Sequence, residues 1–378
     1  MSTERGLRLA VVGGGTGGHV VPGRHLLSEL LGGAGLPRLE DLVWFETGRR
    51  AEAEAMAGLE EALPGVSVER VRLAVEPPGG GAPGTGRLLL RSPRAVLAAR
   101  KALKQHRADL VFGLGGFTLL PVVLAARSLG IPVALLEINA RPGRAVRTLT
   151  PLARRVYHAW TASLPTDAPT RAGRGGRLRH LLTGPPLPRG LATAGEPDDW
   201  RGRVGEGPLL AVLGGSQGAG ALNDFVRAHA PAWCAGGLRV VHQVGPGRMD
   251  EAAPATEGYL PLEFVDDVPG LLRAATLVLC RAGASTLAEV AALGVPALAV
   301  PYPGAGGHQR DNAAELAGGL RLVEEPGLDD ALAAELPDLA GEPGRAWREA
   351  ASGELRRRVP ADASRRILED LLDLVDLG

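Results

Sequence analysis

A chain of 378 residues is longer than one hydrophobic core usually supports, so its length predicts two domains. Hydrophobic residues make up 45% of the chain but aromatic residues only 3%, which argues against a nucleic-acid partner bound by base stacking. No apolar run reaches the roughly 18 residues of a membrane-spanning helix, and the N-terminus lacks the pattern of a signal peptide, so we expect a cytoplasmic protein.

The net charge is zero because two oppositely charged halves cancel. Residues 1–189 contain 26 Arg and Lys against 14 Asp and Glu, whereas the remainder contains 16 against 28. Between Pro77 and Ala108 no residue is acidic, and Arg and Lys are interspersed with Leu and Val. Such a stretch could bind an anionic membrane surface, or it could be the solvated side of a helix that packs on the core; both interpretations stay open.

The first half of the chain alternates segments of strand and helix character. Strands are predicted at 7–12, 41–45, 66–73, 110–113 and 132–136. Helices are predicted at 20–31, 49–58, 93–106 and 119–129, with a loop rich in Pro and Gly at 77–86. This alternation indicates a parallel sheet with right-handed crossovers.

The second half repeats the scheme. Strands are predicted at 208–213, 239–244, 260–264, 277–280 and 297–300, and helices at 286–293, 308–317 and 364–377. We therefore expect an α/β fold with two Rossmann-like lobes facing each other across a cleft: one domain at 1–185, a linker at 186–207, a second domain at 208–355, and a C-terminal helix within 356–378 that packs on either lobe.

A glycine-rich turn follows the first strand of each half, at Gly13–Gly18 and at Gly214–Gly218. Backbone N–H groups at the start of the next helix can hold a diphosphate there. Two such turns indicate two substrates that both carry phosphates. The two cysteines, Cys234 and Cys280, lack the spacing of metal ligands, and we expect buried free thiols and no bound metal.

Seven motifs, in this order, resemble those of the MurG family of glycosyltransferases with the GT-B fold. They are Gly-Gly-Thr-Gly-Gly-His at 14–19, Gly-Leu-Gly-Gly-Phe at 113–117, Glu-Ile-Asn at 137–139, Gly-Gly-Ser-Gln-Gly-Ala at 214–219, Phe-Val-Asp-Asp at 264–267, Cys-Arg-Ala-Gly-Ala-Ser-Thr-Leu-Ala-Glu at 280–289 and His-Gln-Arg-Asp-Asn-Ala at 308–313. The resemblance implies transfer of N-acetylglucosamine from UDP to lipid I, giving lipid II for peptidoglycan, by a peripheral protein at the cytoplasmic face of the membrane.

The resemblance also assigns roles to individual residues. In the second lobe, Val265 would meet the uracil, Glu289 the ribose, Ser216 the diphosphate, Arg281 the nucleotide end, and His308 with Gln309 the sugar hydroxyls. Asn139 and Arg189 would complete the donor site. The diphosphate of the polyprenyl-linked acceptor would lie on the glycine loops of the first lobe, at Gly14, Gly15, Thr16, Gly17, Gly18, Gly115 and Gly116.

Inverting sugar transfer requires a base beside the acceptor hydroxyl and positive potential at the departing diphosphate. His19, whose ordinary pKa is nearest neutrality, is the favoured base, with Glu137 as its rival or orienting partner. Structural alternatives stay open: His19 as a helix cap, and Glu289 in a capping box with Thr286. His308 and Asn312, four residues apart, could form a solvated face, and Asp266-Asp267 more plausibly caps a helix than binds a metal.

The chain departs from the family pattern on the acceptor side. Leu136 and Ile138 stand where the family has polar residues, the usual Gly-Asn-Pro-Val-Arg is replaced by the residues at 184–189, and the second glycine loop continues into the apolar 118–121. Two rival functions follow: a GT-B transferase with another lipid acceptor, and a nucleotide-sugar-binding relative without activity. A third rival is an NAD-dependent dehydrogenase, because Gly13-x-Gly15-x-x-Gly18 follows a predicted strand and Glu46, at the end of the next strand, could bind the ribose.

Overall fold

The structure is a computed structural model that describes residues 1–378 except 1–4, 15–16, 76–84, 167–178, 192–199 and 376–378. The chain forms two compact units. The first contains residues 1–189 together with 362–378, and the second contains residues 190–361.

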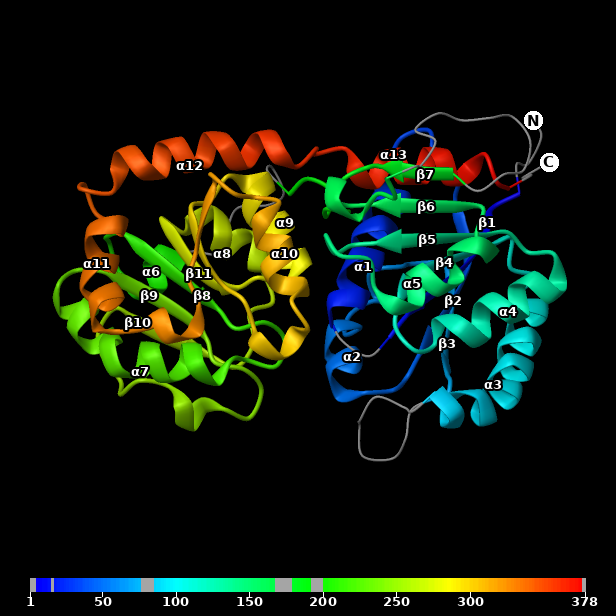
Figure 1. The fold of residues 1–378 in the computed structure, drawn as a ribbon, viewed down its shortest axis with the longest axis horizontal. Coiled ribbons are helices and arrows are strands. Elements are labelled where there is room, and N and C mark those ends of the chain that lie inside the picture. Colours follow the sequence, from blue (N-terminus) through cyan, green and yellow to red (C-terminus); the bar gives the residue numbers. More distant parts are fainter. Residues whose placement is uncertain (1–4, 15–16, 76–84, 167–178, 192–199, 376–378) are drawn as a thin grey trace. The chain divides into compact units, whose positions relative to one another are not determined.

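The first unit is built on a parallel sheet whose seven described strands follow the order β3-β2-β1-β4-β5-β6-β7 (Figure 1). The strands are β1 (Leu7–Gly13), β2 (Leu39–Glu46), β3 (Ser67–Arg72), β4 (Leu110–Gly115), β5 (Val133–Glu137), β6 (Arg155–His158) and β7 (Arg179–Leu182). The central strands β1, β4 and β5 are nearly continuous apolar runs, as expected of parallel strands covered on both faces.

Helices cover this sheet on both faces. They are α1 (Gly17–Gly32), α2 (Arg50–Ala55), α3 (Thr85–Gln105), α4 (Leu119–Leu129), α5 (Arg144–Leu149) and α13 (Ala363–Leu372). Side by side, α3 and α4 bury Ala99, Leu103, Val122 and Ala126 in one core cluster with the sheet residues (Figure 1). The burial of these small and branched side chains fits the scarcity of aromatic residues.

Two features of the first unit differ from the sequence prediction. Helix α3 begins at Thr85 and contains Pro93, whereas the predicted helix begins only at Pro93. Strands β6 and β7 were missed because each has only four residues, including Arg155, His158, Arg179 and His180, and therefore no apolar run. Both are paired in parallel at the end of the sheet.

The C-terminal helix α13 packs on the first unit. Its Asp370 carboxylate accepts hydrogen bonds from Arg155 Nε at 2.8 Å and from the Tyr157 hydroxyl at 2.7 Å. Ser364 donates to the carbonyl of Leu187 at 2.8 Å and accepts from its N–H at 3.1 Å. The region 356–378 is therefore divided, because the last turn of α12 (Arg345–Arg358) belongs to the second unit.

The second unit repeats the topology, with its six described strands in the order β10-β9-β8-β11-β12-β13. They are β8 (Leu209–Leu213), β9 (Arg239–Gln243), β10 (Tyr259–Leu262), β11 (Leu277–Arg281), β12 (Ala297–Val300) and β13 (Leu320–Leu322). The helices are α6 (Trp200–Val204), α7 (Gly220–Ala235), α8 (Val268–Ala274), α9 (Ala284–Leu293), α10 (His308–Ala314), α11 (Asp330–Ala340) and α12. Cys234 and Cys280 are buried free thiols, as predicted.

The described residues of the predicted linker 186–207, namely 186–191 and 200–207, belong to the two units. Leu187 is buried in the first unit, whereas Trp200 and Val204 of α6 are buried in the second. The division between the units falls at Arg189 and Gly190.

In each sheet the strand order reverses beside the first strand of the unit, between β1 and β4 and between β8 and β11. Ligands of such sheets bind outside the carboxyl ends of the strands at this reversal. The topology therefore directs the search for a site to the loops after these strands. Among the described helices, none is both long and apolar enough to cross a membrane.

Candidate functional site

The glycine loops after β1 and β4 pack directly against each other. Gly13 pairs with Gly115 at the end of the two strands. A Cβ atom on Gly116 would lie 2.3 Å from the carbonyl oxygen of Gly14, and Gly116 has a φ of +86°, so only glycine fits. Of the predicted acceptor-diphosphate residues, Gly14, Gly115 and Gly116 thus come together. Helix α1 continues from Gly17 and Gly18, while Gly15 and Thr16 lie outside the described residues.

His19, in the first turn of α1, lies against these loops. Its Nδ1 is 3.2 Å from the carbonyl oxygen of Gly14, and since a carbonyl only accepts, Nδ1 carries the proton. The neutral ring therefore has its lone pair on Nε2, which would lie 2.9 Å from a Cβ on Gly115. Burial lowers the pKa of His19, opposed by the Gly14 hydrogen bond and the charge of Glu52. A partly buried imidazole of this tautomer can accept a proton at Nε2.

Glu137, at the end of β5, anchors its own loop. Its side chain is 2% exposed and accepts hydrogen bonds from the N–H of Gly143 at 2.7 Å and of Asn139 at 3.0 Å. The Asn139 side-chain amide donates to the same carboxylate at 3.3 Å. Burial raises the pKa of Glu137, and these hydrogen bonds oppose the rise. The geometry thus gives Glu137 the role of holding the loop that presents Asn139.

The two apolar departures next to Glu137 lie inside the protein. Leu136 and Ile138 are buried, and the carbonyl of Ile138 accepts a hydrogen bond from the Trp160 indole at 2.9 Å. Their side chains therefore fill the core and do not line the surface of this loop.

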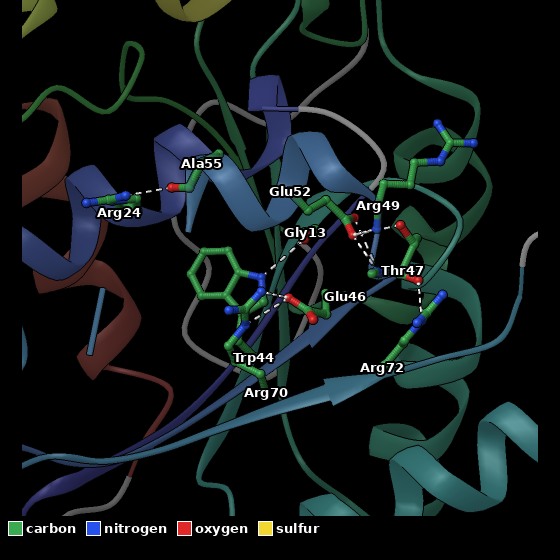
Figure 2. A network of polar contacts seen from close by, with 11 residues as sticks. Gly13, Arg24, Trp44, Glu46, Thr47, Arg49, Glu52, Ala55, Arg70 and Arg72 are labelled. Atoms are coloured by element: carbon green, nitrogen blue, oxygen red, sulfur yellow. Dashed lines mark hydrogen bonds and ion pairs between the residues drawn. The ribbon is translucent and has the colours of Figure 1, made fainter. Parts of the chain in front are cut away.

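Glu52 is a site residue that the sequence analysis missed. The side chain is fully buried in α2, and Oε2 accepts hydrogen bonds from the N–H groups of Thr47 (3.0 Å), Gly48 (2.7 Å) and Arg49 (3.0 Å) and from the Thr47 hydroxyl (2.7 Å) (Figure 2). A Cβ on Gly14 would lie 2.6 Å from Oε1. A glutamate in the first turn of a helix is common, so its sequence position gave no functional signal.

Arg189 lies away from this group within the first unit. The Arg189 guanidinium packs over Gly32, the last residue of α1. The backbone N–H of Arg189 donates to the hydroxyl of Ser28 at 3.2 Å. His19 lies in the first turn of the same 16-residue helix, which spans about 24 Å at 1.5 Å per residue. The structure does not bring Arg189 together with His19.

The second glycine turn, which contains Ser216, connects β8 to α7. The N–H of Gly218 donates to Gly215 at 2.9 Å and closes the turn. A Cβ on Gly218 would lie 2.0 Å from the carbonyl oxygen of Val244, so the loops after β8 and β9 pack as closely as the glycine loops of the first unit. Ser216 precedes the 16-residue helix α7, whose N-terminal dipole favours an anion.

Arg281 and Gln309 support the loop after β12. Arg281 is buried, donates to the carbonyl of Val300 at 3.3 Å, forms an ion pair with Glu325 and lies over the Tyr302 ring. The side-chain oxygen of Gln309 accepts a hydrogen bond from the Tyr302 N–H at 2.8 Å. Both residues therefore fix the loop that leads into α10.

Glu289 lies on α9, and the proposed capping box is wrong. The helix begins at Ala284 with Gly283 as its N-cap, so Thr286 lies inside the first turn and cannot be the cap. Glu289 is 6% exposed, and burial raises its pKa to about 8. Val265, also buried, lies in the loop between β10 and α8.

The remaining structural alternatives have mixed outcomes. Asp267 caps α8 by accepting from the Gly270 N–H at 2.8 Å, as predicted. Asn312 is buried and donates to the carbonyl of Ala282 at 3.4 Å, so a solvated face shared with His308 is wrong. His308 is the first residue of α10. All six predicted donor residues of the second unit thus follow, or end, a strand of its sheet on the carboxyl side. They lie at the end of a strand (Arg281), in loops after strands (Ser216, Val265) or on helices after strands (Glu289, His308, Gln309).

Comparisons with known proteins identify the family. Models of the N-terminal and C-terminal domains of glycosyltransferase family 28 match residues 9–158 and 209–345. A protein of Synechococcus sp. (strain CC9902) is 34% identical over 88% of both chains, and one of Sorangium cellulosum is 37% identical over 96% of this chain and 87% of its own. Both are named UDP-N-acetylglucosamine–N-acetylmuramyl-(pentapeptide) pyrophosphoryl-undecaprenol N-acetylglucosamine transferase. The chain belongs to the MurG family.

Solved structures show the GT-B fold without distinguishing activities within it. The chain is similar to MurG of Acinetobacter baumannii, with a TM-score of 0.67 and 24% identity over 97% of this chain and 99% of that one. A UDP-GlcNAc 2-epimerase of Neisseria meningitidis gives a TM-score of 0.65 at 15% identity, over 97% of this chain and 100% of that one. Sequence identity, and not backbone similarity, therefore places the chain among the MurG glycosyltransferases and excludes the dehydrogenase interpretation.

Proposed function

We propose that this protein transfers N-acetylglucosamine from its UDP conjugate to the muramoyl hydroxyl of lipid I, a polyprenyl-diphosphate-linked acceptor, and so forms lipid II. The observation that carries the proposal is the identity of 32–37% with relatives whose names state this transfer. Preservation of the donor motifs on the carboxyl side of the second sheet supports it. The altered acceptor-side motifs leave the lipid as the part to be tested.

In the proposed reaction His19 is the base. Nε2 takes the proton of the acceptor hydroxyl, the alkoxide oxygen bonds to the anomeric carbon, and the bond from that carbon to the UDP oxygen breaks, with inversion. The positive charge gained by His19 and the negative charge gained by UDP balance. The tautomer fixed by Gly14 supports this role, because it leaves the lone pair on Nε2.

The second unit would bind the donor. Ser216 and the N-terminus of α7 would stabilise the departing diphosphate, with Val265 at the uracil, Glu289 at the ribose, and His308 and Gln309 at the sugar. Because the turn and the helix dipole supply the positive potential, we propose that no metal is needed, which predicts unchanged turnover in the presence of a chelator.

The test is transfer of labelled N-acetylglucosamine from UDP to lipid I by the purified chain. Diacylglycerol and other polyprenyl diphosphates serve as competing acceptors, and UDP-glucose as a competing donor. Product on lipid I alone supports the proposal. Product on another lipid would establish a different acceptor, and tight UDP binding without any product would establish the inactive relative.

We further propose that the exposed face of α3 and α4 binds an anionic membrane surface, which would place the protein peripherally at the cytoplasmic leaflet. Leu97 of α3 is 65% exposed and Leu124 of α4 is 39% exposed, although both helices pack on the core and could have buried these leucines. Arg100 of α3 donates to Ser128 of α4, one turn beyond each leucine, so the two leucines lie near each other. Exposed Arg94, Lys101 and Arg127 surround them.

We expect the double variant Leu97→Glu/Leu124→Glu to bind vesicles containing phosphatidylglycerol at least about tenfold more weakly, because two apolar contacts are lost and two charges oppose the lipid. Co-sedimentation at low and high salt measures this. Leu322→Glu in the second unit, where the leucine is 41% exposed, is the matched control. Equal vesicle binding by all three proteins would exclude this face.

A further inference from the structure

Glu52 is an anion buried beneath a loop that is expected to bind another anion. Burying an ionised carboxylate is strongly unfavourable unless hydrogen bonds compensate. Here Oε2 alone accepts from three backbone N–H groups and one hydroxyl, all within residues 47–49 (Figure 2). Such charge-assisted bonds hold the carboxylate in one orientation.

That orientation directs the second oxygen toward the first glycine turn. Oε1 would be 2.6 Å from a Cβ on Gly14, so the carboxylate and the backbone of Gly14 are in direct contact. The same turn is held by Trp44, whose indole donates to the carbonyl of Gly13 at 3.2 Å (Figure 2). The turn is therefore fixed from β2 and α2 as well as from its own strand.

Gly14 connects this carboxylate to His19. Its carbonyl oxygen accepts from Nδ1 of His19, and this bond fixes both the tautomer and the direction of the ring. Burial disfavours the protonated ring, whereas the charge of Glu52 raises the pKa of His19. Glu52 thus acts on His19 in two ways, through the backbone it contacts and through its charge.

We propose that Glu52 is a positioning residue for sugar transfer, whose carboxylate fixes Gly14 and thereby the ring of His19, and compensates the positive charge that His19 gains when it takes the proton. The inference rests on the proposed role of His19 as base. Glu52 would then be a charged partner of His19, and Glu52 itself would not contact the substrate.

The test compares Glu52→Gln, which keeps the shape and removes the charge, with two controls. Thr47→Val removes one donor of the same network, and Glu60→Gln removes an exposed carboxylate from the same region. We expect Glu52→Gln to lower kcat at least about tenfold with the KM for the UDP-sugar unchanged, because only the proton transfer is affected.

The discriminating measurement is the titration of His19 by NMR of histidine-labelled protein. Loss of the carboxylate should lower the pKa of His19 and shift the acid limb of the kcat profile to lower pH. Both controls should leave the pKa and the acid limb unchanged. An unchanged titration in Glu52→Gln, or an equal shift in Thr47→Val, would reduce Glu52 to a structural role. If the parent protein transfers no sugar, the proposed function fails, yet the titration still decides whether Glu52 acts on His19.

Discussion

Replacing His19 by Gln is expected to lower turnover at least about 100-fold while the affinity for UDP stays within about twofold of the parent. The amide of Gln can still donate to the carbonyl of Gly14 but cannot accept the proton of the acceptor hydroxyl. His19 belongs to the first unit, whereas Ser216 and Glu289, which are assigned to UDP, belong to the second. Steady-state transfer and calorimetric titration with UDP measure the two quantities separately.

The matched control is His25→Gln in the same helix. His25 is the second histidine of α1 whose Nδ1 bonds a backbone carbonyl, that of Pro186 at 3.0 Å, and burial lowers its pKa to about 4. This variant should lose some stability and keep its turnover. A parallel loss of kcat and UDP affinity in His19→Gln would show that His19 only positions substrate.

The pH dependence of kcat gives a second test of the proposal that His19 is the base. Burial lowers the pKa of His19 from 6.5, so the base is already unprotonated at neutral pH. The kcat of the parent should therefore rise with pH along an acid limb that lies below pH 6.5. The residual activity of His19→Gln should lack this acid limb, because the variant has no imidazole to protonate at this position.

The sheets and glycine turns could be predicted because their signals are local. Strands such as β1 and β8 are nearly continuous apolar runs, and Gly116 and Gly218 occupy positions where a Cβ would clash with the backbone of a neighbouring loop. Each of these constraints leaves its mark on the residues themselves. The short polar strands β6 and β7 carry no such mark, because they are strands only through the pairing of β6 with β5 and of β7 with β6.

The part of the site that depends on distant contacts could not be predicted. Glu52 and Gly14 belong to different connections of the sheet, and only the structure brings them together. Glu137 was predicted as a rival base, but nothing in its sequence neighbourhood indicated that Gly143 would engage the carboxylate. Likewise, the position of the Arg189 side chain over Gly32 follows from packing on α1 and not from its motif.

Replacing Glu289 by Gln is expected to make the protein more stable relative to the parent as the pH rises, although it removes a residue of the donor site. The pKa of Glu289 is about 8 in the folded protein, against 4.5 for the group without these surroundings. Because the folded state holds the proton more tightly, this carboxyl's contribution to stability is fully present below pH 4.5. It is lost progressively as the pH rises through 8. Gln is neutral at every pH and avoids this loss.

Urea unfolding of both proteins between pH 5 and pH 8 measures this effect. The advantage of Glu289→Gln should grow across the interval to roughly a few kcal/mol, whereas Glu257→Gln, at an exposed glutamate, should show no such trend. A constant difference would mean that the buried carboxyl does not carry its proton at neutral pH. The variant should also bind UDP at least about tenfold more weakly, because an amide replaces the group that receives the ribose hydroxyls. Greater stability combined with weaker binding would show that the burial of Glu289 is maintained for the nucleotide and not for the fold.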